Sequence, residues 1–175
     1  MTNPRRAGAR AMRGFTLVEI SATLAVAATL ATVALPSFGP MVERRQVEGA
    51  TSQLVADLHF LRMQAVTRNR PLRISFGHHA DGSSCYVLHA DAPAQQDCTT
   101  EAEPIKTVRL AATSRLRLEA NVASIVYDPG YGTSTPAGTL KMSAAGGTAL
   151  HGVVNMMGRV RVCAPGGGFA GYRAC

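Results

Sequence analysis

Two arginines near the C-terminal end are the residues best suited to chemistry on a partner. They lie in the stretch Asn155–Cys163, NMMGRVRVC. Side chains of a strand alternate between its faces, so Arg159 and Arg161 share one face about 7 Å apart while the intervening valine faces the core. That distance is close to the separation of successive phosphates along a nucleic-acid strand. Gly158 suits the positive φ of a tight turn before the strand. The stretch therefore predicts a site for anionic groups.

The distribution of charge also favours an anionic partner. The whole chain has 18 Lys and Arg against 11 Asp and Glu, a formal net charge of +7. Asp128 is the last acid in the sequence. The basic residues after it are Lys141, Arg159, Arg161 and Arg173. Unopposed positive charge attracts polyanions such as DNA. The alternative is the usual one for two arginines on an outer strand face, a solvated surface that resists aggregation.

The last segment of the chain combines glycines with aromatic residues. Gly166, Gly167 and Gly168 precede Phe169 and Tyr172. Glycines let the backbone approach a partner closely. Tyr172 is a candidate to stack on a base if the partner is single-stranded.

No catalytic pattern is present in the sequence. It contains no Gly-x-Ser-x-Gly elbow, no phosphate loop and no His-Glu-x-x-His. His78 and His79 fall in a polar turn, and Glu101 and Glu103 fall in a loop beside a proline, where solvation is expected. We therefore expect a protein that is not an enzyme and that uses no cofactor or metal.

A helix is the first element that must support this site. Apolar residues at helical spacing form one stripe. The stripe consists of Val47, Ala50, Leu54, Leu58, Leu61 and Ala65. Charged residues of the same segment, Asp57 and Arg62 among them, lie mostly off it. The helix is expected to end near Asn69, because Pro71 disfavours helical backbone in the residue before it.

Short strands are the second kind of element. Turn signals rich in Gly, Pro, Asn and Asp separate eight apolar runs. The predicted strands are Leu72–Phe76, Cys85–His89, Thr107–Leu110, Arg115–Glu119, Ser124–Tyr127, Leu140–Ser143, Ala149–Val154 and Arg159–Cys163. The short spacing leaves little room for helical crossovers, so the sheets should be mainly antiparallel. The predicted fold class is α+β, with a long helix packed on small β-sheets.

An apolar segment near the N-terminus carries one acid. Phe15–Leu35 has about 21 residues, which as a helix span about 31 Å, close to the hydrocarbon thickness of a bilayer. Glu19 is its one ionisable residue, and a charge at mid-bilayer costs about 2.5–3.5 kcal/mol. The arginines before the segment are Arg5, Arg6, Arg10 and Arg13. The positive-inside rule therefore places the N-terminus in the cytoplasm. The alternative is a secretory signal, for which Thr32–Ala34 is a weak cleavage site.

The sequence GFTLVE at Gly14–Glu19, behind a basic leader, resembles the class III leader of type IV prepilins and pseudopilins. The resemblance implies that a prepilin peptidase cuts after Gly14 and that the new N-terminal Phe15 is methylated. It also implies that Glu19 pairs with the free amine of a neighbouring subunit in a filament. Opposite charges then offset each other's burial in a low dielectric. Met1 and Met12 both remain as candidate start residues.

Four cysteines follow the apolar segment, namely Cys85, Cys98, Cys163 and Cys175. They allow three pairings, and disulfides are expected because the translocated side of the membrane is oxidising. Nearest-neighbour pairing, Cys85 with Cys98 and Cys163 with Cys175, closes two short loops worth about 3 kcal/mol each. The absence of a Cys-x-x-Cys spacing argues against a zinc site.

The order of features, a prepilin-like helix and then a β-domain ending in Asn-x-x-Gly-Arg-Val-Arg, resembles the GspH/FimT group of minor pilins and pseudopilins. The resemblance implies the type IV pilin architecture. It divides the chain into a cleaved leader (1–14), a transmembrane helix half (15–38), an amphipathic helix half (39–70) and a β-rich pilin domain (71–175). It also implies a single-pass inner-membrane protein whose soluble domain is periplasmic and later lies in a pilus at the cell surface.

The FimT branch is favoured because its Gly-Arg-x-Arg motif is complete in Gly158–Arg161. In that branch the motif is associated with DNA binding during natural transformation. The expected partners are DNA, bound mainly through phosphates, other pilins and the prepilin peptidase. Lys141 and Arg173 would add positive charge to the site. The alternatives are a GspH-like pseudopilin with a structural role in type II secretion, and a plain membrane-anchored or secreted β-domain.

Overall fold

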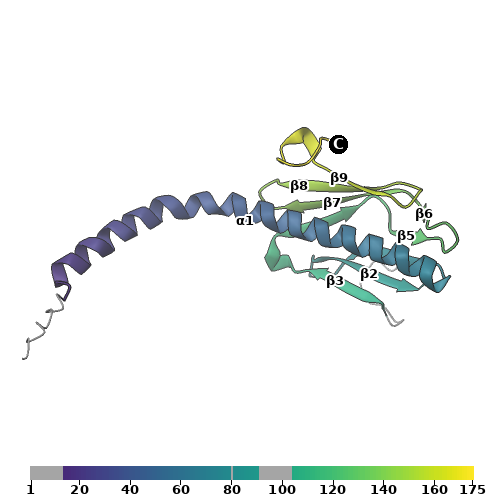
Figure 1. The fold of residues 1–175 in the computed structure, drawn as a ribbon, viewed down its shortest axis with the longest axis horizontal. Coiled ribbons are helices and arrows are strands. Elements are labelled where there is room, and N and C mark those ends of the chain that lie inside the picture. The colour runs from purple at the N-terminus through teal and green to yellow at the C-terminus, as the bar shows by residue number, and fades with distance from the viewer. Residues whose placement is uncertain (1–13, 80, 91–103) are drawn as a thin grey trace, which may run out of the picture. The chain divides into compact units, whose positions relative to one another are not determined.

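The described part of the chain forms one long helix and two antiparallel sheets (Figure 1). This computed structural model describes residues 14–79, 81–90 and 104–175, without the side chains of residues 33–37 and 112. The chain divides into two compact units, Met1–Gly39 and Pro40–Cys175. Both sheets belong to the second unit, so this unit carries the candidate site.

The helix α1 runs from Leu17 to Arg68. At its start the Thr16 hydroxyl accepts a hydrogen bond from the Glu19 N–H at 3.2 Å, which is the contact of an N-cap. At its end Asn69 adopts a positive φ of 49°, and the Arg70 N–H bonds the Ala65 carbonyl at 3.2 Å. This left-handed C-cap confirms that the helix ends just before Asn69.

The first unit contributes the N-terminal part of α1. Apolar side chains such as Leu17, Leu24 and Leu30 are exposed along it in the single chain. In the part of the chain that the structure describes, no helix is long and apolar enough to cross a membrane. Residues 1–13, which hold most of the predicted leader, lie outside the described residues.

The strands form a five-stranded and a four-stranded sheet in which every pairing is antiparallel. The first has the order β3-β2-β1-β5-β6, and its strands are β1 Leu72–His78, β2 Ser84–Ala90, β3 Lys106–Leu110, β5 Ser124–Tyr127 and β6 Ser134–Thr135. The second has the order β4-β7-β8-β9, and its strands are β4 Leu116–Ala120, β7 Gly138–Ala144, β8 Ala149–Val154 and β9 Val160–Cys163. The α+β prediction is thereby confirmed. The strand β6 was not predicted, because two residues are too short to show alternation.

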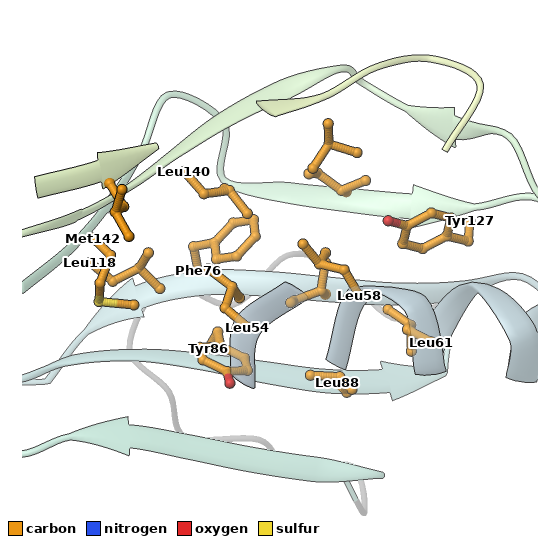
Figure 2. Packing of buried hydrophobic residues seen from close by; sticks show 14 of the residues in the cluster. Leu54, Leu58, Leu61, Phe76, Tyr86, Leu88, Leu118, Tyr127, Leu140 and Met142 are labelled. Atoms are coloured by element: carbon orange, nitrogen blue, oxygen red, sulfur yellow. The ribbon is translucent and has the colours of Figure 1, made fainter. Parts of the chain in front are cut away.

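The apolar stripe of α1 packs against both sheets, as predicted. Val47, Leu54, Leu58, Leu61 and Ala65 are buried in one hydrophobic cluster with residues of the strands. Figure 2 shows the three leucines of α1 lying among Phe76, Tyr86, Leu88 and Leu140. Burying each such side chain contributes about 1.5–3 kcal/mol, so the stripe anchors the helix to the β-domain.

One acid of α1 is buried, although the charged residues of the helix were expected to lie mostly off the apolar stripe. Asp57 is buried and accepts a hydrogen bond from the Tyr86 hydroxyl at 2.8 Å. The Lys106 ammonium lies 2.6 Å from the same carboxylate. Periodicity could not reveal this, because the two partners lie on β2 and β3. The group ties α1 to the five-stranded sheet.

Candidate functional site

The turn between β8 and β9 sets the direction of the two predicted arginines. The Asn155 side chain accepts a hydrogen bond from the Arg159 N–H at 2.9 Å, and the Asn155 carbonyl accepts one from the Gly158 N–H at 2.9 Å. Gly158 has a φ of 72°. Arg159 directly precedes β9 and Arg161 lies within it, so the strand begins one residue later than predicted. Both arginines are exposed, and their spacing of two residues is that of side chains on one face of extended backbone.

A third arginine joins them from the C-terminal loop. Arg159, Arg161 and Arg173 line a shallow hollow of about 320 Å³ together with Val162 and Cys163. The predicted disulfide between Cys163 and Cys175 is present, with a Cα–Cα distance of 5.0 Å. The Arg173 carbonyl also accepts a hydrogen bond from the Ala164 N–H at 2.8 Å. The bridge and this bond hold Arg173 beside the end of β9.

The positive charge in the hollow has no acidic partner in the described part of the chain. The ion pairs among the described residues are made by other basic side chains. Examples are Arg109 with Asp81 at 2.7 Å and Arg117 with Glu119 at 4.0 Å. Guanidinium groups offer several donors in a planar fork that matches phosphate or carboxylate oxygens. Three unpaired guanidinium groups around one hollow therefore form a site suited to anions.

Lys141, which was predicted to add charge, does not line this hollow. It lies on β7, two strands from β9 in the sheet order. Its ammonium lies 3.3 Å from the carboxylate of Glu119 on β4. Lys141 therefore belongs to the same sheet as Arg161, but its charge is balanced by Glu119.

Gly158 has a packing role that its motif did not reveal. It is buried, and a Cβ atom built on it would lie 2.3 Å from the Gly132 carbonyl oxygen. Gly132 belongs to the loop between β5 and β6, and its carbonyl accepts a hydrogen bond from Arg62 Nε of α1 at 2.8 Å. Gly158 is therefore needed where two turns and the helix meet.

Replacing Gly158 with alanine is expected to lower the free energy of unfolding by more than about 2 kcal/mol. Positive φ alone costs a non-glycine residue about 1–2 kcal/mol, and the clash with Gly132 adds to that. Urea unfolding of the segment Pro40–Cys175 measures the change. The matched control is Gly147→Ala, since Gly147 has a φ of 89° but nothing within 4 Å of its added Cβ. Equal losses in both variants would show that the contact with Gly132 is unimportant.

Tyr172, the predicted residue for base stacking, instead makes contacts within the protein. Its ring packs edge-on against Phe169 at 5.2 Å between centroids, and its hydroxyl donates to Glu48 of α1 at 3.2 Å. Burial and, after it, the Glu48 carboxylate raise the pKa of Tyr172. Arg44 lies over the Phe169 ring at 4.4 Å and donates to the Ala170 carbonyl at 2.6 Å. The C-terminal loop is thus docked on α1.

Three large apolar residues near the arginines were missed by the sequence reasoning. Tyr131 is 87% exposed in the loop between β5 and β6, and Met156 and Met157 are exposed in the turn between β8 and β9. The sequence could have indicated that Tyr131 is exposed, because it lies between Gly130 and Gly132 in a turn and side chains of such turns seldom reach the core. An aromatic ring there is free to meet a partner.

The other predicted residues that the structure describes are not among those that line this hollow. Gly14 and Phe15 are exposed before α1, and Glu19 lies in its first turn. Cys85 is disulfide-bonded, and Cys98 lies outside the described residues. The described residues hold no group of three or more His, Cys, Asp or Glu side chains placed to bind a metal ion.

Comparison with known proteins gives a family and a fold. A family model described as type II transport protein GspH matches residues 50–168. The type IV minor pilin FimU of Pseudomonas aeruginosa has a similar structure, with a TM-score of 0.55 and 21% identity over 73% of this chain and 98% of FimU. The minor pseudopilin EpsH of the Vibrio cholerae Type 2 Secretion System has a TM-score of 0.48 and 13% identity, covering 69% of this chain and 98% of EpsH. No curated protein matches the sequence significantly. The similarity to FimU shows a shared fold.

Proposed function

The chain belongs to the GspH family, and from this premise we propose that it is a minor pilin of a type IV pilus that binds DNA. The proposed contacts are made by Arg159, Arg161 and Arg173, and the proposed role is DNA uptake in natural transformation. The observation that carries the proposal is the convergence of these three arginines on one hollow without an acidic partner among the described residues.

The proposed contacts are to phosphates rather than to base edges. Arginines on an exposed strand face meet the backbone of a nucleic acid, which is the same for every sequence. Binding is then independent of sequence and sensitive to salt. One subunit is expected to bind weakly, and several subunits along a filament would raise the overall affinity through avidity.

The N-terminal segment would connect this site to a filament. We propose that the leader is removed after Gly14, that Phe15 is methylated, and that Phe15–Leu35 holds the protein in the inner membrane before assembly. The structure describes this segment without the side chains of residues 33–37. The proposal rests on the leader-like sequence Gly14–Glu19 and on the four arginines before it. Glu19 would then meet the amine of a neighbouring subunit.

A structural pseudopilin of a type II secretion system is the second candidate function. The description of the matching family model favours it. In that case the partners are other pseudopilins, and the β-domain does not bind DNA. Neighbouring genes for pili and competence, rather than for secretion, would favour the first candidate.

The test of DNA binding uses the segment Pro40–Cys175. This segment contains every residue of the buried hydrophobic cluster, so it carries its own core. We expect it to shift DNA in a gel at low salt. The logarithm of the association constant should fall with the logarithm of salt concentration with a slope of about −3, because three arginines displace counterions. Failure to bind at low salt would reject the DNA-binding function and leave the pseudopilin.

A further inference from the structure

An exposed tyrosine lies on a rigid loop at the edge of the arginine site. Within the loop between β5 and β6, the Asp128 carboxylate accepts hydrogen bonds from the N–H groups of Gly130 and Tyr131 at 2.9 and 3.2 Å. The Gly132 N–H bonds the Asp128 carbonyl at 3.0 Å. These bonds fix the backbone at Tyr131, while its side chain remains in solvent. Little backbone entropy would therefore be lost when the ring binds a partner.

This loop and the first residue of β6, Ser134, contact the turn that precedes Arg159. The Ser134 N–H donates to the Met156 carbonyl at 2.9 Å, and the Ser134 hydroxyl donates to the Asn155 carbonyl at 2.6 Å. Gly132, next to Tyr131, packs against Gly158, next to Arg159. The two turns lie at the same end of the sheets (Figure 1). Tyr131 and Arg159 therefore lie on either side of the contact between Gly132 and Gly158, although they are far apart in the sequence.

Several apolar side chains are exposed near Tyr131. Met156 and Met157 are 64% and 67% exposed in the adjoining turn. Tyr131 also lines a hollow of about 390 Å³ with Met63 and Val66 of α1, and the lining of this hollow includes His59, Arg62 and Thr67. An apolar surface with an aromatic ring, placed beside a row of arginines, fits a molecule that is both anionic and flat-faced. A nucleobase attached to its phosphate has this character.

From this arrangement we propose that the site takes single-stranded DNA, with its phosphates along β9 at Arg173, Arg161 and Arg159 and one base stacked on Tyr131. This inference rests on the proposed DNA-binding function and specifies its substrate. In a duplex the bases are paired and stacked inside, so they cannot reach the ring without being extruded. The nearby Asp128 carboxylate is occupied by two backbone N–H groups, which offset its repulsion of phosphate.

The experiment uses the full chain in detergent micelles and compares a labelled oligothymidine with a duplex of mixed sequence by fluorescence anisotropy. We expect Tyr131→Ala to weaken binding of the single strand about tenfold, because it removes one stacking contact between a base and an aromatic ring. Binding of the duplex should change less than about twofold. Tyr131→Phe keeps the ring and should bind the single strand like the parent.

A spectroscopic readout separates stacking from a general structural effect. The chain has no tryptophan and 4 tyrosines. Tyr86 and Tyr127 are buried, and the Tyr172 hydroxyl is bonded to Glu48. Stacking of a base on Tyr131 should therefore quench tyrosine fluorescence when oligothymidine is added to the parent. Tyr131→Ala should lose this quenching, and the duplex should cause little of it.

Three outcomes would overturn the inference and can be told apart. If Tyr131→Ala binds the single strand like the parent while the arginine variant described below does not, the stacking proposal fails and the DNA-binding function stands. If the parent binds neither form of DNA at low salt, the DNA-binding function itself fails. If Tyr131→Ala reduces self-association in sedimentation and leaves oligothymidine binding unchanged, the apolar surface is a contact between protein copies.

Discussion

Replacing Arg159 and Arg161 together with alanine is expected to weaken DNA binding by the segment Pro40–Cys175 about a hundredfold. Each arginine makes a charge-assisted contact worth about 1.5 kcal/mol or more, and two such contacts amount to about two orders of magnitude. The slope of the salt dependence should become shallower by about 2. Electrophoretic shift and anisotropy titrations over a range of salt concentrations measure both effects.

The same double variant should unfold at the same temperature as the parent. Both side chains are exposed, and neither forms an ion pair with a described residue. Surface substitutions of this kind usually change stability by less than about 0.5 kcal/mol. A loss of DNA binding with an unchanged unfolding curve therefore assigns the effect to the site rather than to the fold.

The chain contains a matched control for this experiment. Arg115 and Arg117 have the same spacing, are exposed, and lie at β4, the opposite edge of the four-stranded sheet from β9. Arg115→Ala with Arg117→Ala removes the same charge and should weaken binding less than about threefold, because Arg117 is already near Glu119. If both pairs matter equally, net charge drives the binding. If the Arg159 and Arg161 variant binds like the parent, the site is wrongly assigned.

Removing the buried carboxylate of Asp57 is expected to have the largest effect on stability. The variant Asp57→Ala should lower the free energy of unfolding by about 3 kcal/mol, because it leaves the Lys106 ammonium and the Tyr86 hydroxyl without their shared partner. Burial and the hydrogen bond to Asp57 raise the pKa of Tyr86, so its hydroxyl stays protonated and needs an acceptor. Lys106 is 37% exposed and can regain some hydration, which keeps the loss at the lower end of that for buried pairs.

Urea unfolding of the segment Pro40–Cys175 measures this loss, and Glu119→Ala is the control. Glu119 also contacts basic side chains, Lys141 and Arg117, but it is 47% exposed. Exposed pairs contribute about 0–1 kcal/mol, so the control should change stability little. Similar losses in the two variants would contradict the assignment of Asp57 as a buried anchor. Below its unfolding temperature, Asp57→Ala should still bind DNA, because the acid lies on α1 and not at β9.

Local patterns in the sequence predicted the elements of this protein. The helical spacing of the stripe from Val47 to Ala65 gave the face that is buried against the sheets. Alternation and turn residues gave eight of the strands to within a few residues, and β6 was too short to be detected. The same alternation placed Arg159 and Arg161 on one face, and the short separation of Cys163 and Cys175 favoured the pairing that is found. These features are set by neighbours in the chain, which is why periodicity and spacing reveal them.

The composition of the site was decided by contacts between segments far apart in the chain. From the sequence, Lys141 and Arg173 were both expected to add charge to the site. In the structure Lys141 lies next to Glu119 of the neighbouring strand β4, whereas the disulfide holds Arg173 beside β9. The sequence suggested Tyr172 as the aromatic residue of the site, but Tyr172 contacts α1 in the docked C-terminal loop, whereas Tyr131 is exposed in the loop between β5 and β6. Spacing along one segment carries no information about which other segment folds against it. The fold class was therefore determined by the sequence itself, and the set of free charges and rings was determined by tertiary packing.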